Sequence, residues 1–233
     1  MNWQNIRISN DNTYFQSGNT SLFDKVFIEV LKFHAPGIAA VKDESGAYHI
    51  DINGHAVYPE RYARSFGYYC NRAAVIENDH WFHLNEKGEK LCQFDYSWTG
   101  NYQEDFCSVR DKNNYYFHID LNGKKTYNEN YVYCGDYKDG IACVRRQDGS
   151  YIHIDETGKP LNEKPFIDLG IFHKKFATAR DFKGWHHIAK SGDQLYSERY
   201  LAVEPFYNGY ALVTDFNLRK SIIDEEGFVV LQL

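Results

Sequence analysis

Histidine recurs with the most regular spacing of any residue type here that can do acid–base or metal chemistry. Five imidazoles stand 34 or 35 residues apart, at His49, His83, His118, His153 and His187. One histidine per repeat unit puts each ring in a separate place, whereas a metal ion needs its ligands together at about 2 Å. We therefore predict structural hydrogen bonds from these rings, to their own turn (where Asp155 shares a strand face with His153) or to the neighbouring unit. A pH-responsive or ligand role is the alternative.

Other patterns with catalytic or metal-binding meaning are missing from the sequence. It contains no G-x-S-x-G, G-x-x-x-x-G-K-[ST], H-E-x-x-H or G-x-G-x-x-G motif. The adjacent His186 and His187 would point to opposite faces of a strand. The five cysteines include no C-x-x-C pair and are expected to be reduced thiols, with Cys107 and Cys143 filling the core. We expect no catalytic residue, no bound metal and no cofactor.

Three Tyr-x-Glu-x-Tyr segments are the best candidates for a binding surface. They recur 69 residues apart and combine aromatic rings with charge, which is typical of recognition surfaces. The candidate residues are Tyr58, Glu60, Tyr62, Tyr127, Glu129, Tyr131, Tyr196, Glu198 and Tyr200. In the alternative interpretation, the first tyrosine of each segment packs between repeats. The pairs Arg145–Arg146 and Lys174–Lys175 are expected to be ordinary solvated charges.

The composition is that of an acidic, β-rich globular protein. Of 233 residues, 43% are hydrophobic and 17% aromatic, so the chain can bury a core and favours strands. The net charge of −6 argues against a nucleic-acid partner, and no apolar run approaches the length of a membrane span. The N-terminal residues lack the basic and apolar regions of a secretory signal. We therefore expect a cytoplasmic location, with export by a signal-less route left open.

The elements that must position these residues come from a repeat of 34 or 35 residues. A glycine closes the turn of each unit, at Gly54, Gly88, Gly123, Gly158, Gly192 and Gly227. In step with it run an apolar column (Ile50, Leu84, Ile119, Ile154, Ile188, Ile223) and a small-residue column (Ala39, Ala73, Cys107, Ala142, Ala177, Ala211). In five of the six units, Asp or Asn three residues before the glycine predicts a type I turn. Each unit is therefore predicted to be a few short strands joined by tight turns.

We predict an all-β fold of six tandem repeats, at about 34–70, 71–104, 105–139, 140–174, 175–208 and 209–233. Neighbouring units must stack, because a sheet of about 35 residues cannot cover both its faces. A six-bladed β-propeller is favoured, and an open β-solenoid or stack of β-hairpin repeats is the alternative. Residues 1–233 are taken as a single repeat domain. Within it, the segment 1–33, extended rather than helical at 22–33, would supply the missing fourth strand of the last unit and close the ring.

The repeat resembles the bacterial WG (KWG) repeat over about residues 34–233. The resemblance rests on a lead-in of aromatic-x-x-Gly-x-Ala-x-Val and on a following strand that ends Ile-Asp-x-x-Gly-Lys. The position of the family tryptophan holds Trp81, Tyr116, Tyr151 and Trp185, with Ala47 and Lys220 as departures. The family glycine is replaced throughout, by Tyr48, Phe82, Phe117, Ile152, His186 and Ser221. The resemblance implies a WG repeat-containing interaction module without catalytic residues.

The sequence favours a non-enzymatic scaffold that binds a protein or peptide partner. A multivalent carbohydrate-binding, lectin-like propeller is the alternative, because aromatic residues recur at equivalent positions in several units. An enzyme is the third hypothesis. It predicts one pocket that breaks the repeat symmetry and contains strongly perturbed titratable groups.

Overall fold

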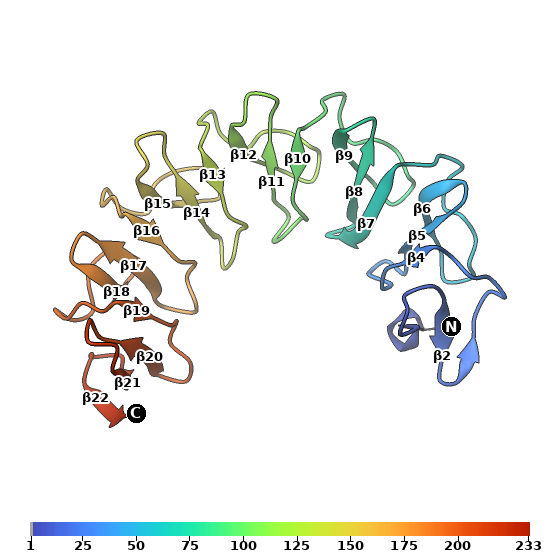
Figure 1. Ribbon diagram of the computed structural model, residues 1–233. Helices are drawn as coiled ribbons and strands as arrows, with labels where there is room; N and C mark the ends of the chain where they lie inside the picture. The colour runs from blue at the N-terminus through green and yellow to red at the C-terminus, as the bar shows by residue number, and fades with distance from the viewer. Residues whose placement is uncertain (1) are drawn as a thin grey trace. The chain divides into compact units, whose positions relative to one another are not determined.

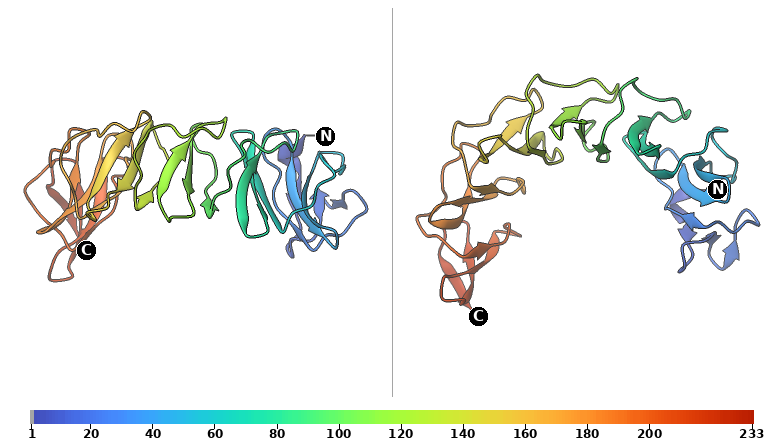
Figure 2. Two further views of the ribbon diagram at one scale, coloured as in Figure 1. Left: turned by 90° about the horizontal axis from the view of Figure 1, so that it is seen from above. Right: turned by 45° about the horizontal axis from the view of Figure 1, so that its top comes forward.

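The computed structural model describes residues 2–233 and is built from seven small antiparallel sheets (Figure 1). The described residues contain no α-helix, only the 3-10 turn η1 at Trp3–Asn5. Nothing helical between residues 2 and 233 is long and apolar enough to cross a membrane. The predicted all-β repeat fold is confirmed. The further views in Figure 2 show the same succession of separate sheets.

The chain divides into two compact units. Unit 1 comprises the residues up to Asn114 together with His118–Lys125, and unit 2 comprises Tyr115–Phe117 and Thr126–Leu233. The strands before the division are β1 (Arg7–Ile8), β2 (Phe15–Ser17), β3 (Thr20–Ser21), β4 (Glu29–Val30), β5 (Ala39–Asp43), β6 (Gly46–Ile50), β7 (Arg64–Tyr69), β8 (Arg72–Glu77), β9 (His80–Leu84), β10 (Trp98–Thr99) and β11 (Cys107–Arg110). Strand β12 (Tyr116–Ile119) spans the division.

The remaining strands belong to unit 2, and they are β13 (Tyr133–Cys134), β14 (Ile141–Arg145), β15 (Tyr151–Asp155), β16 (Asp168–Leu169), β17 (Ala177–Asp181), β18 (Gly184–Ile188), β19 (Ala202–Val203), β20 (Tyr210–Thr214), β21 (Lys220–Asp224) and β22 (Val229–Gln232). Within each sheet the strands lie in chain order, as in β13-β14-β15 and β19-β20-β21-β22. Each of the six repeats therefore has a short lead-in strand, then a central strand, then a third strand, which carries the histidine in five of them.

The repeated columns become the core of each sheet. The apolar column on the third strand is at most 1% exposed in all six repeats, and the small column on the central strand is buried throughout. Strands such as β14 and β15 are buried over consecutive residues, as expected where a sheet is covered on both sides. The turn after the third strand has the predicted geometry: in the first repeat, the Gly54 amide donates to the Asp51 carbonyl at 3.0 Å, and Asp51 Oδ1 accepts from the Asn53 amide at 2.9 Å.

The N-terminal segment differs from the expectation. Residues 7–21 form a seventh sheet, β1-β2-β3, that the repeat count did not include. The segment that follows was predicted to be extended and to complete the last sheet. It is extended at Glu29–Val30, but there it pairs with β5, in the register Glu29↔Lys42 and Val30↔Val41. The last sheet takes its fourth strand from β22, which pairs with β21. The hydrogen bonds expected to close the ring are thus made inside the first repeat.

Candidate functional site

Four of the recurring histidines join their sheet to the lead-in strand of the next sheet. His49 Nε2 lies 2.7 Å from the Phe66 carbonyl oxygen, and His187 Nε2 lies 2.8 Å from that of Glu204. The same bond, 17 residues along the chain, links His83 to Gly100 at 3.3 Å and His153 to Gly170 at 2.8 Å. A carbonyl only accepts, so Nε2 carries the proton. These four rings make structural hydrogen bonds, as predicted, but within the bounds set from the sequence each partner carbonyl belongs to the same unit, for example 34–70 for His49. The Asp155 carboxylate instead accepts from the Thr157 and Lys159 amides in its own turn.

The second ring nitrogen of these histidines accepts a tyrosine hydroxyl in the first and fifth repeats. Tyr58 donates to His49 Nδ1, and Tyr196 donates to His187 Nδ1 at 2.5 Å. Burial lowers the pKa of His49, His83, His153 and His187 to about 4. These imidazoles are therefore neutral near pH 7 and enclosed in the core.

The six tyrosines of the Tyr-x-Glu-x-Tyr segments are buried, so they are not the exposed contact surface that the sequence suggested. Their exposed fractions lie between 5% and 9%, and the two rings of each segment meet edge to face, with centroids 5.9–6.1 Å apart. The first ring also covers the turn glycine of the next repeat. A Cβ on Gly88 would lie 2.2 Å from the Tyr58 ring. Of the nine candidate residues, the three glutamates are the exposed ones, at Glu60, Glu129 and Glu198.

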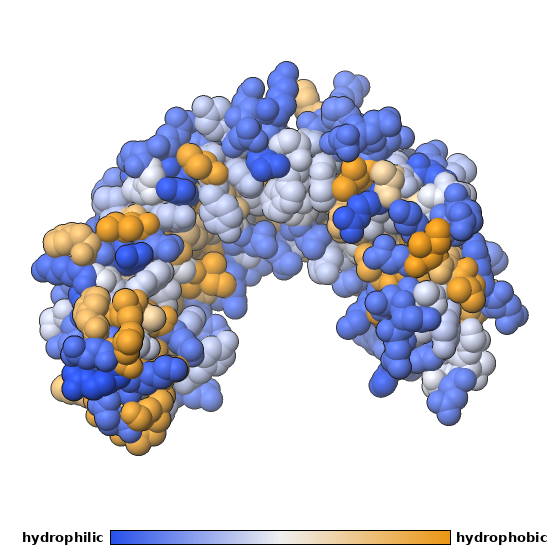
Figure 3. Space-filling model, in the orientation of Figure 1, coloured by the Kyte–Doolittle hydropathy of each residue, from blue (hydrophilic) through white to orange (hydrophobic). Residues whose placement is uncertain are grey.

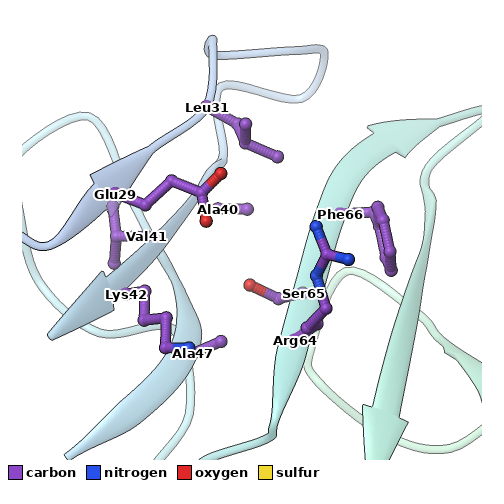
Figure 4. Close-up of a pocket in the computed structure, with 9 residues that line it drawn as sticks. All are labelled: Glu29, Leu31, Ala40, Val41, Lys42, Ala47, Arg64, Ser65 and Phe66. Atoms are coloured by element: carbon purple, nitrogen blue, oxygen red, sulfur yellow. The ribbon is translucent and has the colours of Figure 1, made fainter. Parts of the chain in front are cut away.

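Unit 1 contains a trough between the sheet of β4, β5 and β6 and the neighbouring strand β7 (Figure 4). Its volume is about 380 Å³, and it is lined by Glu29, Leu31, Ala40, Val41, Lys42, Ala47, Arg64, Ser65 and Phe66. Figure 4 shows the Glu29 carboxylate pointing into the space, with Arg64 and Ser65 on the opposite wall. A second cavity of about 520 Å³ shares Glu29, Leu31 and Phe66 and adds Lys32 and His34.

The side chains of β7 hold one wall of the trough in place. The Arg64 guanidinium carbon lies 5.5 Å from the centroid of the Phe66 ring. That ring stacks on Trp81, with centroids 5.2 Å apart and an interplanar angle of 17°. Within residues 2–233, no ion pair joins Glu29 to Lys42 or to Arg64. The wall therefore presents an exposed guanidinium that lies over the Phe66 ring to whatever enters the trough.

Unit 2 carries a row of exposed apolar side chains at the starts of its lead-in strands. Val132, Ile167 and Leu201 occupy the same repeat position and are 41%, 52% and 45% exposed. One residue further on, Tyr133 lies opposite Arg145, and Asp168 lies opposite Arg180, in the strand ladders. Figure 3 shows apolar surface gathered over the C-terminal sheets. We call these seven residues the strand-end surface.

The strand-end surface was not predicted from the sequence. Arg145 was expected to be an ordinary solvated charge, but it belongs to a set of cations that recurs at one repeat position. One residue after the valine column, a cation stands in four of six repeats, at Lys42, Arg110, Arg145 and Arg180. Packing does not require a cation at an exposed position, so the recurrence of cations here was the sequence feature that could have indicated this surface.

The described residues offer no metal or redox centre. No group of three His, Cys, Asp or Glu side chains between residues 2 and 233 could hold a metal ion. All five cysteines are free thiols, and Cys107 and Cys143 are 1% and 4% exposed, as expected for core-filling residues. Burial raises the pKa of the Cys143 thiol to about 12, so it is not a thiolate near neutral pH.

Comparison with known proteins identifies a fold and no family. No protein-family model matches the chain, and no curated protein matches it in sequence. Among solved structures, the chain is similar to the crystal structure of a eukaryotic initiation factor. The two share 11% identity and a TM-score of 0.60, over 98% of this chain and 72% of the other. The fold is that of a β-propeller-like repeat protein.

The chain is also similar to BamB from Moraxella catarrhalis, with 14% identity and a TM-score of 0.49, over 98% of this chain and 84% of that protein. Identities this low compare architectures and say nothing of ligands.

Proposed function

We propose that this protein is a repeat scaffold that binds a protein or peptide partner through the strand-end surface of unit 2. The observation that carries the proposal is the row of Val132, Ile167 and Leu201, each more than two-fifths exposed, at one repeat position. Apolar side chains exposed in a contiguous row are typical of interaction surfaces. Their recurrence suits an extended partner that contacts several repeats in succession.

The charges opposite the next residue of each lead-in strand indicate the chemistry of the partner. Arg145 and Arg180 are exposed, in a protein whose net charge is −6. Arginine and tyrosine are enriched in the energetically dominant parts of protein interfaces, and Tyr133 lies directly opposite Arg145. A partner segment that alternates acidic and apolar side chains complements this arrangement.

The sheets themselves support a relation to the WG repeat, which we retain as a proposal. Trp81 and Trp185 stand at the position of the family tryptophan, each on the histidine-bearing strand of its sheet. The lectin-like alternative was motivated by the recurring Tyr-x-Glu-x-Tyr rings. Since those rings are buried, they cannot be the sugar-binding surface that the lectin-like hypothesis assumed.

A peptide-display selection against the whole chain tests the scaffold proposal. We expect selected peptides to combine acidic and apolar residues. Their affinity should fall at least about tenfold for the double variant Arg145→Glu/Arg180→Glu, because two attractive contacts become repulsive.

The matched control is Lys174→Glu/Lys175→Glu, which makes the same change of charge at exposed residues outside the strand-end surface. Equal loss in the control would show a non-specific charge effect. Undiminished binding to Arg145→Glu/Arg180→Glu would place the site elsewhere, and either result contradicts the proposal.

A further inference from the structure

The trough of unit 1 lies where the first repeat departs from the others. At one position of the histidine-bearing strand, four of the six repeats carry a large aromatic residue, namely Trp81, Tyr116, Tyr151 and Trp185. The first repeat has Ala47 there, and Ala47 lines the trough. The trough therefore lies where four other repeats have an aromatic side chain and the first repeat has only the methyl group of Ala47.

The other repeats show what such a ring does. Tyr116 meets Tyr133 of the following lead-in strand, with centroids 6.0 Å apart. Tyr151 has the Arg145 guanidinium 5.5 Å from its ring centroid. These two aromatic side chains pack beside residues at the strand ends, and one of the neighbours is a cation. In the first repeat, the counterpart of Tyr133 is Arg64, 69 residues earlier, and it stands across the trough from Ala47.

The lining of the trough combines an apolar floor with a mostly basic rim. Ala40, Val41 and Ala47 are almost fully buried and form apolar floor. Lys42 and Arg64 line the same space, and Lys32 lines the adjoining cavity, against the single carboxylate of Glu29. Three cations against one anion, in a chain of net charge −6, favour an acidic ligand. The carboxylate disfavours a multiply charged phosphate and can accept a peptide N–H.

We propose that this trough receives an aromatic side chain from a protein partner, flanked by an acidic residue that pairs with Arg64. The incoming ring takes the place that Trp81, Tyr116, Tyr151 and Trp185 fill in their own repeats. A guanidinium can hold a carboxylate through two parallel hydrogen bonds, and the contact of Arg64 with the Phe66 ring, which itself stacks on Trp81, limits its freedom before binding. The proposal rests on the proposed function only in taking the partner to be a protein.

Titration of the whole chain with a blocked Glu-Trp-Glu tripeptide, followed by calorimetry or by amide NMR shifts, tests the ligand chemistry. We expect it to bind at least about tenfold more tightly than blocked Glu-Ala-Glu, blocked Lys-Trp-Lys or N-acetyl-tryptophan amide. Equal binding of Glu-Ala-Glu would show that the aromatic ring contributes nothing, which contradicts the proposal. Equal binding of the tryptophan amide would show that the flanking acidic residue contributes nothing, which also contradicts the proposal. If Glu-Trp-Glu does not bind at all, the trough is not a site for this ligand.

Two variants locate the binding. Ala47→Trp puts a ring of the chain's own into the trough, at a position where Trp81 and Trp185 are already accommodated, and should abolish binding at an unchanged melting temperature. Arg64→Glu should weaken Glu-Trp-Glu at least about tenfold and strengthen Lys-Trp-Lys, because the sign of the rim contact is reversed. Should Ala47→Trp fail to fold, this reversal decides the question alone. Unchanged affinities in Arg64→Glu would refute the proposal.

The control variants separate this site from the strand-end surface. Arg145→Glu/Arg180→Glu and Lys175→Glu should leave tripeptide binding unchanged, because none of these residues lines the trough. Loss of display peptides in the first of these variants with retained tripeptide binding supports both sites. Loss of tripeptide binding in Arg145→Glu/Arg180→Glu would contradict an independent trough.

Discussion

His153 has one ring nitrogen without a partner, unlike His49 and His187. Its Nδ1 is buried and makes no hydrogen bond, whereas the same atom of His49 and His187 accepts a tyrosine hydroxyl. The cause is a single residue: nine positions after the histidine stands Asn162, where those repeats have Tyr58 and Tyr196. A buried, unsatisfied nitrogen costs about 1–3 kcal/mol.

Asn162→Tyr should therefore stabilise the protein by about 1 kcal/mol, because its hydroxyl can donate to His153 Nδ1. Gly192 lies beneath this side chain, as Gly88 lies beneath Tyr58, so the ring has a place to pack. The free energy of unfolding in urea is the measurement. Asn162→Phe is the control, because it adds the ring without the hydroxyl, and equal stability of the two variants would contradict the hydrogen-bond argument.

At the scale of elements, successive sheets of a unit are joined where a side chain of one repeat covers the turn glycine of the next. Tyr58 covers Gly88, Tyr127 covers Gly158, and Phe23 of the N-terminal sheet covers Gly54 in the same way. All three glycines have positive φ, between +80° and +81°. The turn must therefore be glycine for two reasons, its backbone conformation and the ring that lies against it.

Gly88→Ala should destabilise the protein by about 2–4 kcal/mol, since it adds a clash with the Tyr58 ring to the cost of a positive φ. Gly18→Ala is the matched control: its φ is +59°, and nothing lies within 4 Å of the added Cβ. It should cost only about 1 kcal/mol. Unfolding in urea measures both, and similar losses would show that the ring contact contributes little.

The N-terminal sheet should be an integral part of unit 1. Phe15 is fully buried and its ring meets Phe23, Phe27 and Phe33, with centroids 5.8, 6.3 and 4.9 Å away. Phe15→Ala is expected to cost about 3–5 kcal/mol, the usual loss for a buried phenylalanine. Thermal unfolding followed by circular dichroism measures it against Phe228→Ala, at a residue that is 69% exposed. Equal melting temperatures would mean that this sheet is not part of the core.

At the scale of the whole molecule, buried neutral histidines recur in both units, so protonation acts on the whole chain. In the unfolded chain a histidine has a pKa of about 6.5. Four of the recurring rings have a pKa of about 4 in the folded protein, because burial penalises their charged form. Between these values the unfolded state binds more protons, and acid favours unfolding.

The free energy of unfolding should therefore be highest above pH 6.5 and fall as the pH approaches 4. At pH 5 each of the four histidines lowers it by roughly 2 kcal/mol, and together they approach the stability of a typical domain. Urea unfolding at pH 7, 6 and 5 measures the slope. His49→Gln should reduce that slope by about one proton. A stability independent of pH over this range would contradict the assignment.

The repeat period, the core columns and the Asx-x-x-Gly turns were predictable from the sequence, because the spacing of side chains along one strand and the geometry of one turn are local properties. The sequence also contains a partial sign of the N-terminal sheet, because Phe23 and Phe27 stand 35 residues before Tyr58 and Tyr62. That segment lacks the repeated histidine and turn glycine by which the other units were recognised. Whether a tyrosine faces solvent or a neighbour depends on the turn glycine brought against it from the next repeat. The trough likewise depends on which strands surround Ala47, since a missing side chain leaves a cavity only where the neighbours do not close over it. These contacts join residues far apart in the chain, and only the tertiary structure decides them.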